Sequence, residues 1–245
     1  MMKVVAIIQA RMGSTRLPGK VMKTILGKPV ILWDIERLEL SKLIEEIIIA
    51  IPFGSENDII ERTVLANTNA TIFRGSENDV LDRYYHAALV SDADVVVRVT
   101  SDCPLIDSHV VDRVIDHFLN NDCDYCSNTI IRSYPRGLDA EVFSFASLEK
   151  AWKEAELDYE REHVTPYIIF DSSSVFKKLN VSNDTDLSHL RWTLDTTEDF
   201  ELIDIIYKKI FPHKKLFFMG DILDLIGKQP ELIEINRYVE QKKIK

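Results

Sequence analysis

The 245-residue chain has only three cysteines, fewer basic than acidic residues and no long hydrophobic run. Cys103, Cys123 and Cys126 are too few for a disulfide framework, which is typical of a protein from a reducing compartment. The stretch "CDYC" has C-x-x-C spacing, which raises a redox or zinc interpretation. Because no nearby C-x-x-C or H-x-x-x-H supplies a second pair of zinc ligands, we interpret the three cysteines as structural.

The lack of excess basic residues, of a long apolar run and of a signal sequence restricts the cellular location and the binding partners of the protein. The chain has 40 Asp and Glu against 30 Lys and Arg, and this balance disfavours broad contact with nucleic acid, which needs a basic surface. No apolar run is long enough to span a bilayer. The start, "MMKVVAIIQAR", lacks the apolar core and cleavage site of a secretory signal. We therefore expect a cytoplasmic protein that binds neither nucleic acid nor membrane.

The first 125 residues repeat one pattern four times: a short apolar, β-branched run, a turn and a helical stretch. Continuously apolar strands are those covered on both faces, and strand–helix alternation produces a parallel sheet. We predict an α/β fold with a doubly wound, mostly parallel Rossmann-like sheet. Pro29 is expected at a first helical position and Ser55 at an N-cap. The expected strands are 3–10, 45–51, 71–75 and 93–102, and the expected helices are 29–40, 55–67, 78–89 and 107–121.

The pattern changes after residue 125, which indicates a small inserted α+β lobe. Because no linker, repeat or low-complexity tract is visible, we treat 1–245 as a single domain with an excursion at about 126–190. The later elements are expected to be a strand within 133–145, helices at 147–156 and 161–171, strands at 174–181 and 190–195, a helix at 198–211, and a helical C-terminus from 220 that ends in a basic tail.

Positive charge is concentrated on one turn, "QARMGSTRLPGK", directly after the first predicted strand. Arg11, Arg16 and Lys20 surround Gly13 and Gly19 there. Ligands of open parallel sheets bind beyond the carboxyl ends of the strands, and glycines allow backbone N–H groups to face a ligand. The turn therefore predicts a site for a small anion such as a triphosphate.

Two common phosphate-binding loops are excluded by counting. A Walker loop has four residues between its glycines, followed by Lys and Ser or Thr. Here five residues separate the two glycines, and Val21 follows the lysine. The dinucleotide pattern G-x-G-x-x-G is also absent. Ser14 and Thr15 still add hydroxyl donors to the turn. We expect neither a P-loop NTPase nor a nicotinamide-dependent enzyme.

Six blocks along most of the chain resemble the cytidylyltransferases that make CMP-linked sugar acids. They are "QARMGSTRLPGK", "RGSENDVLDRY", "VRVTSDCPLID", "GLDAEVF", "REHVTPY" and "WTLDTTEDF". The resemblance covers the 3-deoxy-manno-octulosonate and acylneuraminate enzymes, and more narrowly the SpsF-type branch of spore coat polysaccharide biosynthesis. It implies the nucleotide-diphospho-sugar transferase type of fold, CTP and a sugar acid as substrates, Mg²⁺ as cofactor, and a homodimer.

The resemblance also implies roles for the segments and for the first block. It makes about 1–125 the nucleotide-binding half, about 126–190 the acceptor-binding and dimerisation excursion, and about 191–245 the C-terminal metal strand and helices. Lys20 would neutralise the α-phosphate and Arg11 the β- and γ-phosphates, with Asp102 as the third catalytic residue. The implied nucleotide-binding residues are Ala10, Arg11, Gly13, Ser14, Arg16, Lys20, Arg74 and Ser76. The alternative to nucleotide binding by Arg16 is that this residue is a solvated loop arginine.

Asp102 and Asp195 are the metal-binding residues that the resemblance implies. Two carboxylates about 4 Å apart repel each other by about 4 kcal/mol at a surface-like dielectric, so their convergence would require a cation between them. Mg²⁺ takes a few carboxylates and leaves its other positions to water and phosphate. The alternatives are that Asp102 shapes a turn and that Asp195 caps a helix with Glu198 at capping-box spacing; Thr196 is another candidate for that cap.

The acceptor pocket is expected in the excursion. Asp139 and Glu141 lie two residues apart, on one face of the predicted strand, with a solvated strand face as the alternative. His163 is either an acceptor ligand or a structural histidine. The carboxylate of a sugar acid would pair with a cation such as Arg136, Arg161 or Arg191. The predicted acceptor-binding residues are Asp139, Glu141, Arg161, His163 and Arg191.

Departures from the family pattern leave the acceptor open. Gln9 stands where the octulosonate enzymes have proline, and "TSDCP" replaces their residues around the metal aspartate. Two other functions also remain: a metal-dependent glycosyltransferase, which usually presents D-x-D, and a nucleotide-binding module without catalysis. A nucleotidyltransferase using another NTP or a sugar phosphate is a further alternative.

Overall fold

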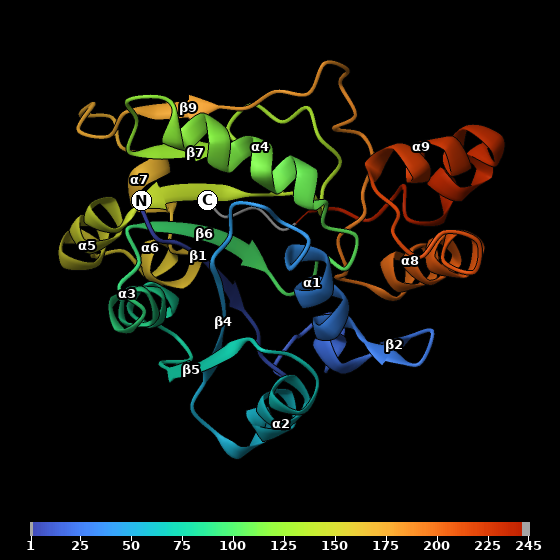
Figure 1. The fold of residues 1–245 in the computed structure, drawn as a ribbon, viewed down its shortest axis with the longest axis horizontal. Coiled ribbons are helices and arrows are strands. Elements are labelled where there is room, and N and C mark those ends of the chain that lie inside the picture. The colour runs from blue at the N-terminus through green and yellow to red at the C-terminus, as the bar shows by residue number, and fades with distance from the viewer. Residues whose placement is uncertain (1, 242–245) are drawn as a thin grey trace.

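The computed structural model describes residues 2–241, and its centre is one seven-stranded sheet flanked by helices (Figure 1). The strand order is β5-β4-β1-β6-β8-β7-β9. The strands are β1 (Val4–Gln9), β4 (Glu46–Pro52), β5 (Thr71–Gly75), β6 (Val95–Thr100), β7 (Tyr125–Ser127), β8 (Glu141–Ser144) and β9 (Lys178–Asn180). A separate two-stranded hairpin is formed by β2 (Thr24–Ile25) and β3 (Lys28–Pro29).

The four strands of the first half are parallel to one another, as the sequence predicts. β1 pairs with β4 on one side and with β6 on the other, and β5 extends the sheet beyond β4. The added strand β8 runs antiparallel to β6 and β7, while β7 and β9 are parallel. The sheet is thus mostly parallel, and the excursion completes it instead of folding apart from it.

Helices cover both faces of the sheet because the strands are apolar on both. The helices are α1 (Val30–Leu38), α2 (Asp58–Asn67), α3 (Val80–Val90), α4 (Ser108–Leu119), α5 (Phe145–Glu154), α6 (Asp158–His163), α7 (Pro166–Ile169), α8 (Thr197–Ile210) and α9 (Met219–Lys228). One face packs on α1, α2 and α4, and the other on α3, α5 and α7. Figure 1 shows α3 and α5 to the left of the sheet and α1 to its right.

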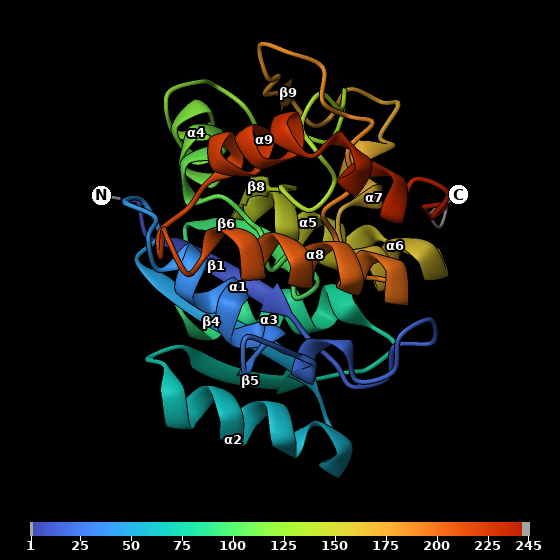
Figure 2. The same cartoon turned by 90° about the vertical axis from the view of Figure 1, so that its right-hand side faces the viewer.

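A third hydrophobic cluster joins the C-terminal helices to the rest of the fold. The side chains of α8 and α9 pack around Trp192 and against Trp33 of α1. Figure 2 shows α8 and α9 together on the side of the molecule where α1 lies. This packing fixes the 190–196 segment, which carries Asp195, between the C-terminal helices and the sheet. No helix in the described part of the chain has the length and apolar character that crossing a membrane requires.

Several local predictions are wrong, each for a visible reason. Pro29 precedes α1 instead of beginning it, because it pairs with Thr24 in the hairpin. Ser55 begins a 3₁₀ turn, and Asn57 is the residue before α2. The predicted helix at 161–171 is split into α6 and α7 at Val164, whose φ is 72°.

The segment 190–195 is not a strand. It makes one isolated bridge, between Arg136 and Arg191. The Trp192 N–H donates to the Arg136 carbonyl and the Leu194 N–H to the Asp102 carbonyl, so its hydrogen bonds go to loops and not to a neighbouring strand. The end of the predicted basic tail, 242–245, lies outside the described residues.

Candidate active site

A cavity of about 620 Å³ opens beyond the carboxyl ends of β1 and β6. This is the edge of a parallel sheet at which ligands bind. It receives side chains from the loop after β1, the turn after β6, the 129–141 segment and the 190–196 segment. The predicted site residues that line it are Ala10, Arg11, Ser14, Arg16, Lys20, Asp102, Asp139, Glu141, His163 and Asp195.

The loop after β1 is folded so that Lys20 enters this cavity. Gly19 has a φ of 65°, in the left-handed region that favours glycine, and its N–H donates to the Met12 carbonyl at 3.1 Å. Val21 is buried in the core, which anchors the far end of the loop. The Lys20 ammonium donates to Asp102 Oδ2 at 2.7 Å and to Asp195 Oδ1 at 2.8 Å.

Backbone hydrogen bonds bring the two aspartates together from distant parts of the sequence. Asp102 lies in the turn after β6, where Thr100 Oγ1 donates to its Oδ1 at 2.5 Å. The Asp102 carbonyl accepts from the Leu194 N–H at 2.7 Å and from Thr193 Oγ1 at 3.2 Å. The 190–196 segment is therefore attached directly to the turn that carries Asp102.

Arginines hold the second oxygen of Asp195. Its Oδ2 accepts from Arg16 Nη2 at 2.8 Å and from Arg191 Nη2 at 2.9 Å. Arg191 is itself fixed by the buried carboxylate of Asp199, 2.8 Å from its Nε. The N-cap of α8 is Thr196, paired with Asp199 in a capping box. Asp195 is thus free of the capping role that one interpretation of the sequence gave it.

The charges of this cluster support one another. Burial alone would lower the pKa of Lys20, but the Asp102 and Asp195 carboxylates outweigh it and raise that pKa. Burial would likewise raise the pKa of Asp102. The Lys20 charge and the hydrogen bonds that the Asp102 carboxylate accepts hold that pKa below its usual value. Both shifts favour the charged forms, so at neutral pH the partly buried Lys20 ammonium binds an ionised Asp102 carboxylate.

The donor set fits a magnesium ion. Two carboxylates from separate segments already converge on a single cation, the Lys20 ammonium. Within residues 2–241 no cluster of three or more His, Cys, Asp or Glu side chains is arranged to hold a metal. An ion at Asp102 and Asp195 would therefore take its remaining ligands from water and from a bound substrate, as Mg²⁺ commonly does.

A family model described as cytidylyltransferase matches residues 5–244. The chain belongs to the cytidylyltransferase family. This assignment and the shared fold make it a nucleotidyltransferase, and they confirm the resemblance given by the six sequence blocks.

Individual relatives agree with the assignment. The structure of a cytidylyltransferase from Leptospira borgpetersenii superposes with a TM-score of 0.90 and 36% identity, covering 99% of this chain and 100% of that one. The Bacillus subtilis spore coat polysaccharide biosynthesis protein SpsF is 30% identical over 232 residues, which are 92% of this chain and 94% of SpsF. The 3-deoxy-manno-octulosonate cytidylyltransferase of Bdellovibrio bacteriovorus is 33% identical over 121 residues, about half of each protein.

Not all predicted nucleotide-binding residues of this cytidylyltransferase reach the cavity. Arg74 lies within β5, not in the loop after it, and its guanidinium pairs with Asp58 and Glu61. Ser76 Oγ accepts from the Asp79 N–H and does not line the cavity. Gly13 belongs to the loop but is not part of the cavity wall.

The predicted acceptor residues also separate into two groups. Asp139, Glu141 and His163 line the cavity. Asp139 precedes β8 and does not share a strand face with Glu141, because the strand begins at Glu141. Neither of these two carboxylates is simply solvated: Asp139 binds Arg132, and Glu141 binds Arg98.

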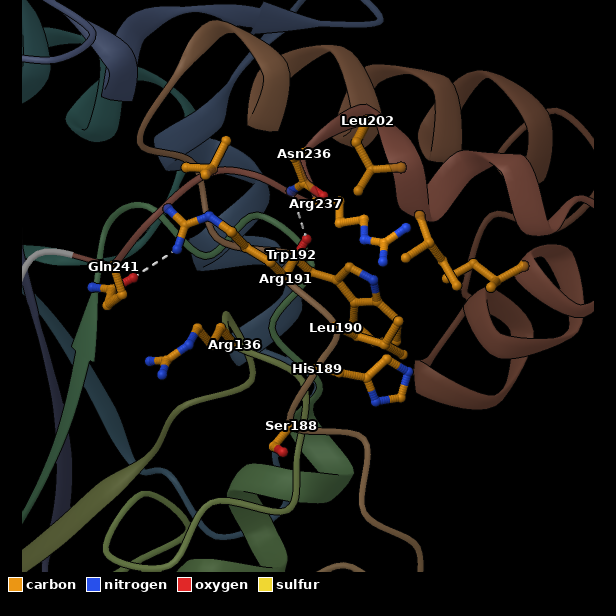
Figure 3. A pocket seen from close by; sticks show the side chains of 13 residues that line it. Arg136, Ser188, His189, Leu190, Arg191, Trp192, Leu202, Asn236, Arg237 and Gln241 are labelled. Atoms are coloured by element: carbon orange, nitrogen blue, oxygen red, sulfur yellow. Dashed lines mark hydrogen bonds between the residues drawn. The ribbon is translucent and has the colours of Figure 1, made fainter.

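Arg161 and Arg191 do not reach the cavity. Arg161 pairs with Asp79 and donates to the Trp152 carbonyl, so it joins α6 to the start of α3. Arg191 lies behind Asp195, in the wall of a smaller pocket of about 110 Å³ (Figure 3). Its contact with Asp195 makes it a support for that carboxylate.

Three arginines of the cavity and one buried carboxylate were not predicted. Arg98 interrupts the otherwise apolar strand "VVVRV", and this interruption is a signal that the sequence offered. Arg83 and Arg132 have no such signal. Asp34 is fully buried in α1, and burial, reinforced by the nearby Asp102 charge, raises its pKa well above the ordinary value.

Proposed function

We propose that this cytidylyltransferase transfers CMP from CTP to a sugar acid, with Mg²⁺ as cofactor and pyrophosphate as leaving group, in surface polysaccharide biosynthesis. The observation that carries the proposal is the junction of Lys20 with Asp102 and Asp195 in the wall of the cavity. It combines a phosphate-directed cation with the pair of carboxylates that a metal-bound nucleotide needs.

In this reaction an acceptor oxygen attacks the α-phosphorus of CTP, and the bond from that phosphorus to the oxygen bridging to the β-phosphate breaks. The protein needs to form no covalent intermediate, so its residues act by positioning and by stabilising charge. Lys20 would contact the α-phosphate, and Arg11 and Arg16 line the cavity from the same loop. Asp102 and Asp195 would hold Mg²⁺, which supplies positive charge to the phosphate oxygens.

The excursion supplies the other wall of the cavity. Glu141 is fixed by Tyr125, whose hydroxyl donates to its Oε1 at 2.7 Å, and by Thr165, whose hydroxyl donates to the same oxygen at 2.9 Å. A carboxylate held in this way is suited to accept hydrogen bonds from sugar hydroxyls. A homodimeric state and a cytoplasmic location stay predictions from the sequence.

The test is pyrophosphate release by the full-length protein with CTP, UTP, GTP or ATP and Mg²⁺. Each nucleotide is offered with a panel of sugar acids, including 3-deoxy-manno-octulosonate, and with sugar phosphates. We expect release only with CTP and an acceptor, with a CMP-linked product detected by mass spectrometry. Nucleotide sugars are offered as donors in a parallel assay, where transfer without pyrophosphate release would establish a glycosyltransferase instead. Nucleotide binding without any turnover would indicate a binding module.

A further inference from the structure

Of the arginines that the described part of the excursion contributes to the cavity, one is not paired with a carboxylate. Arg132 binds Asp139 through two hydrogen bonds of 2.5 and 2.8 Å. Arg136 lines the same cavity, and within the described residues 2–241 its side chain has no hydrogen bond or ion pair. The remaining candidates for binding an acidic acceptor, Arg161 and Arg191, are occupied by Asp79 and by Asp195 with Asp199.

The backbone around Arg136 is fixed against the segment that carries Asp195. The Arg136 N–H donates to the Leu190 carbonyl at 3.0 Å, and its carbonyl accepts from the Trp192 N–H at 2.7 Å. Gly137 has a φ of 99°, and a Cβ at this position would lie 2.6 Å from the Trp192 carbonyl carbon. Only glycine fits there, so the position from which the Arg136 side chain starts is well determined.

Two other guanidinium groups, Arg132 and Arg191, lie near Arg136, and both are already paired with carboxylates. Figure 3 shows its side chain extending toward the side where Arg191 and Gln241 lie, and Gln241 lines the large cavity as well. Burial, together with the charges of Arg132 and Arg191, lowers the pKa of Arg136. An unpaired guanidinium near two other guanidinium groups is stabilised by any anion that reaches it, and its planar fork matches a carboxylate or a phosphate.

The source of this anion follows from the arrangement of the site. The loop after β1 already offers Arg11, Arg16 and Lys20 for the triphosphate. Arg136 comes from the excursion, together with Asp139 and Glu141, and so belongs to the half of the cavity that remains for the second substrate.

We propose that Arg136 binds an anionic group of the acceptor and thereby selects acidic acceptors over neutral ones. This inference rests on the proposed function. It assigns acceptor choice to a residue that the nucleotide does not need.

The experiment compares wild-type protein with Arg136→Gln, Arg136→Lys and the control Arg237→Gln. The control variant removes the same charge from a nearby position, where Arg237 pairs with Glu234 and does not line the large cavity. The acceptors are 3-deoxy-manno-octulosonate, other sugar acids, their methyl esters and sugar phosphates, and KM and kcat are measured for CTP and for each acceptor. Circular dichroism and the melting temperature establish that each variant is folded.

We expect Arg136→Gln to raise KM for the acidic acceptor roughly 10- to 100-fold, the range for losing a hydrogen bond to a charged group. KM for CTP should stay within about twofold, because the Arg136 side chain is not part of the junction of Lys20 with Asp102 and Asp195. The discrimination between acid and methyl ester should disappear in Arg136→Gln. Arg136→Lys should lose less, since it keeps the charge but not the fork.

The outcomes separate the two proposals. If the wild-type protein releases no pyrophosphate with any acceptor, the proposed function fails, and the role of Arg136 fails with it. Three outcomes in the presence of wild-type turnover would overturn only the role of Arg136. In the first, Arg136→Gln leaves KM for the acceptor unchanged, and in the second it raises KM for CTP instead. In the third, the wild-type protein uses methyl esters as well as it uses acids. Dependence on Arg136 with sugar phosphates alone would support the anion site and identify the anion as phosphate.

Discussion

The Lys20 ammonium lies between the carboxylates of Asp102 and Asp195, at 2.7 and 2.8 Å. The three residues come from the loop after β1, the turn after β6 and the segment before α8. The cation offsets the repulsion between the two carboxylates before substrate arrives, and in the proposed function a metal ion and a phosphate would bind at this place. The junction therefore has separate consequences for catalysis and for stability.

Replacing Asp102 should remove metal-dependent activity without unfolding the protein. Asn keeps the shape of the side chain but not its charge, so Asp102→Asn should reduce Mg²⁺-dependent pyrophosphate release at least 100-fold, the scale for losing a preorganised charge at the reacting phosphate. The measurement is a pyrophosphate assay across a Mg²⁺ titration, with the melting temperature as a check of folding. The control is Asp184→Asn, because Asp184 is highly exposed and outside the cavity. Unchanged turnover in Asp102→Asn would remove the metal role.

Replacing Lys20 should affect the rate more than the affinity for CTP. In Lys20→Met the α-phosphate loses a cation that acts mainly as charge develops, so kcat should fall roughly 100- to 1,000-fold while KM for CTP changes much less. Steady-state kinetics with CTP and a saturating acceptor separate these two quantities. A rise in KM at constant kcat would make Lys20 a binding residue only.

Nucleotide specificity can be tested without an acceptor. A ligand that binds only the folded state stabilises it by about 2.7 kcal/mol at a hundred times its Kd. Thermal-shift measurements with Mg²⁺ should therefore show a larger increase in melting temperature with CTP than with UTP, GTP or ATP. Chelation of the metal should reduce the CTP effect, because Asp102 and Asp195 would then repel the triphosphate. Equal shifts with all four nucleotides would contradict the choice of CTP.

The structure also predicts which arginine of the β5 region is dispensable for the nucleotide. Arg74 pairs with Asp58 and Glu61 on α2 and is not part of the cavity wall. Arg74→Ala should therefore leave KM for CTP within about twofold and should have only a small effect on the melting temperature, as expected for a partly exposed ion pair. A tenfold rise in KM would return Arg74 to the nucleotide site, where the sequence pattern placed it.

Local signals were sufficient for the parallel half of the sheet and for the position of the Lys20 turn at its edge, whereas Asp102 and Asp195 were singled out through the family resemblance. The continuously apolar strands locate the sheet edge. The cluster of basic residues after β1 marks the turn, and counting its residues excludes the two common phosphate-binding loops. What the sequence could not show is which arginines are already paired. Arg161 and Arg74 look as available as Arg136 in the sequence, and only the fold brings Asp79, Asp58 and Glu61 to the first two.

The sequence also failed to predict the irregular segments, again because their partners are distant in the chain. "LRWTLD" has the composition of a strand, but its N–H groups donate to the carbonyls of Arg136 and Asp102, which are distant in the sequence. Similarly, β7 has only three residues and is stabilised by its partners β8 and β9. Pairings of this kind depend on tertiary contacts that no window of a single sequence contains.

The cysteines provide a prediction for pH dependence. Cys103 and Cys126 are buried, whereas Cys123 is partly exposed. Burial raises the pKa of the Cys126 thiol from 9.0 to about 12, which makes its thiolate fraction near pH 8 about a thousandfold smaller. A thiol reagent at pH 8 should therefore modify Cys123 in the native protein and the other two only after unfolding.

The raised pKa of Cys126 also predicts the direction in which alkaline pH changes the stability of the fold. The Cys126 thiol is favoured over the thiolate in the folded state, so its contribution to stability is complete below pH 9 and is lost as the pH rises toward 12. Alkaline unfolding of Cys126→Ala should accordingly depend less steeply on pH than that of the wild type between pH 9 and 12. Rapid modification of two or three thiols in the native protein, or stoichiometric zinc binding at "CDYC", would contradict the structural role of the cysteines.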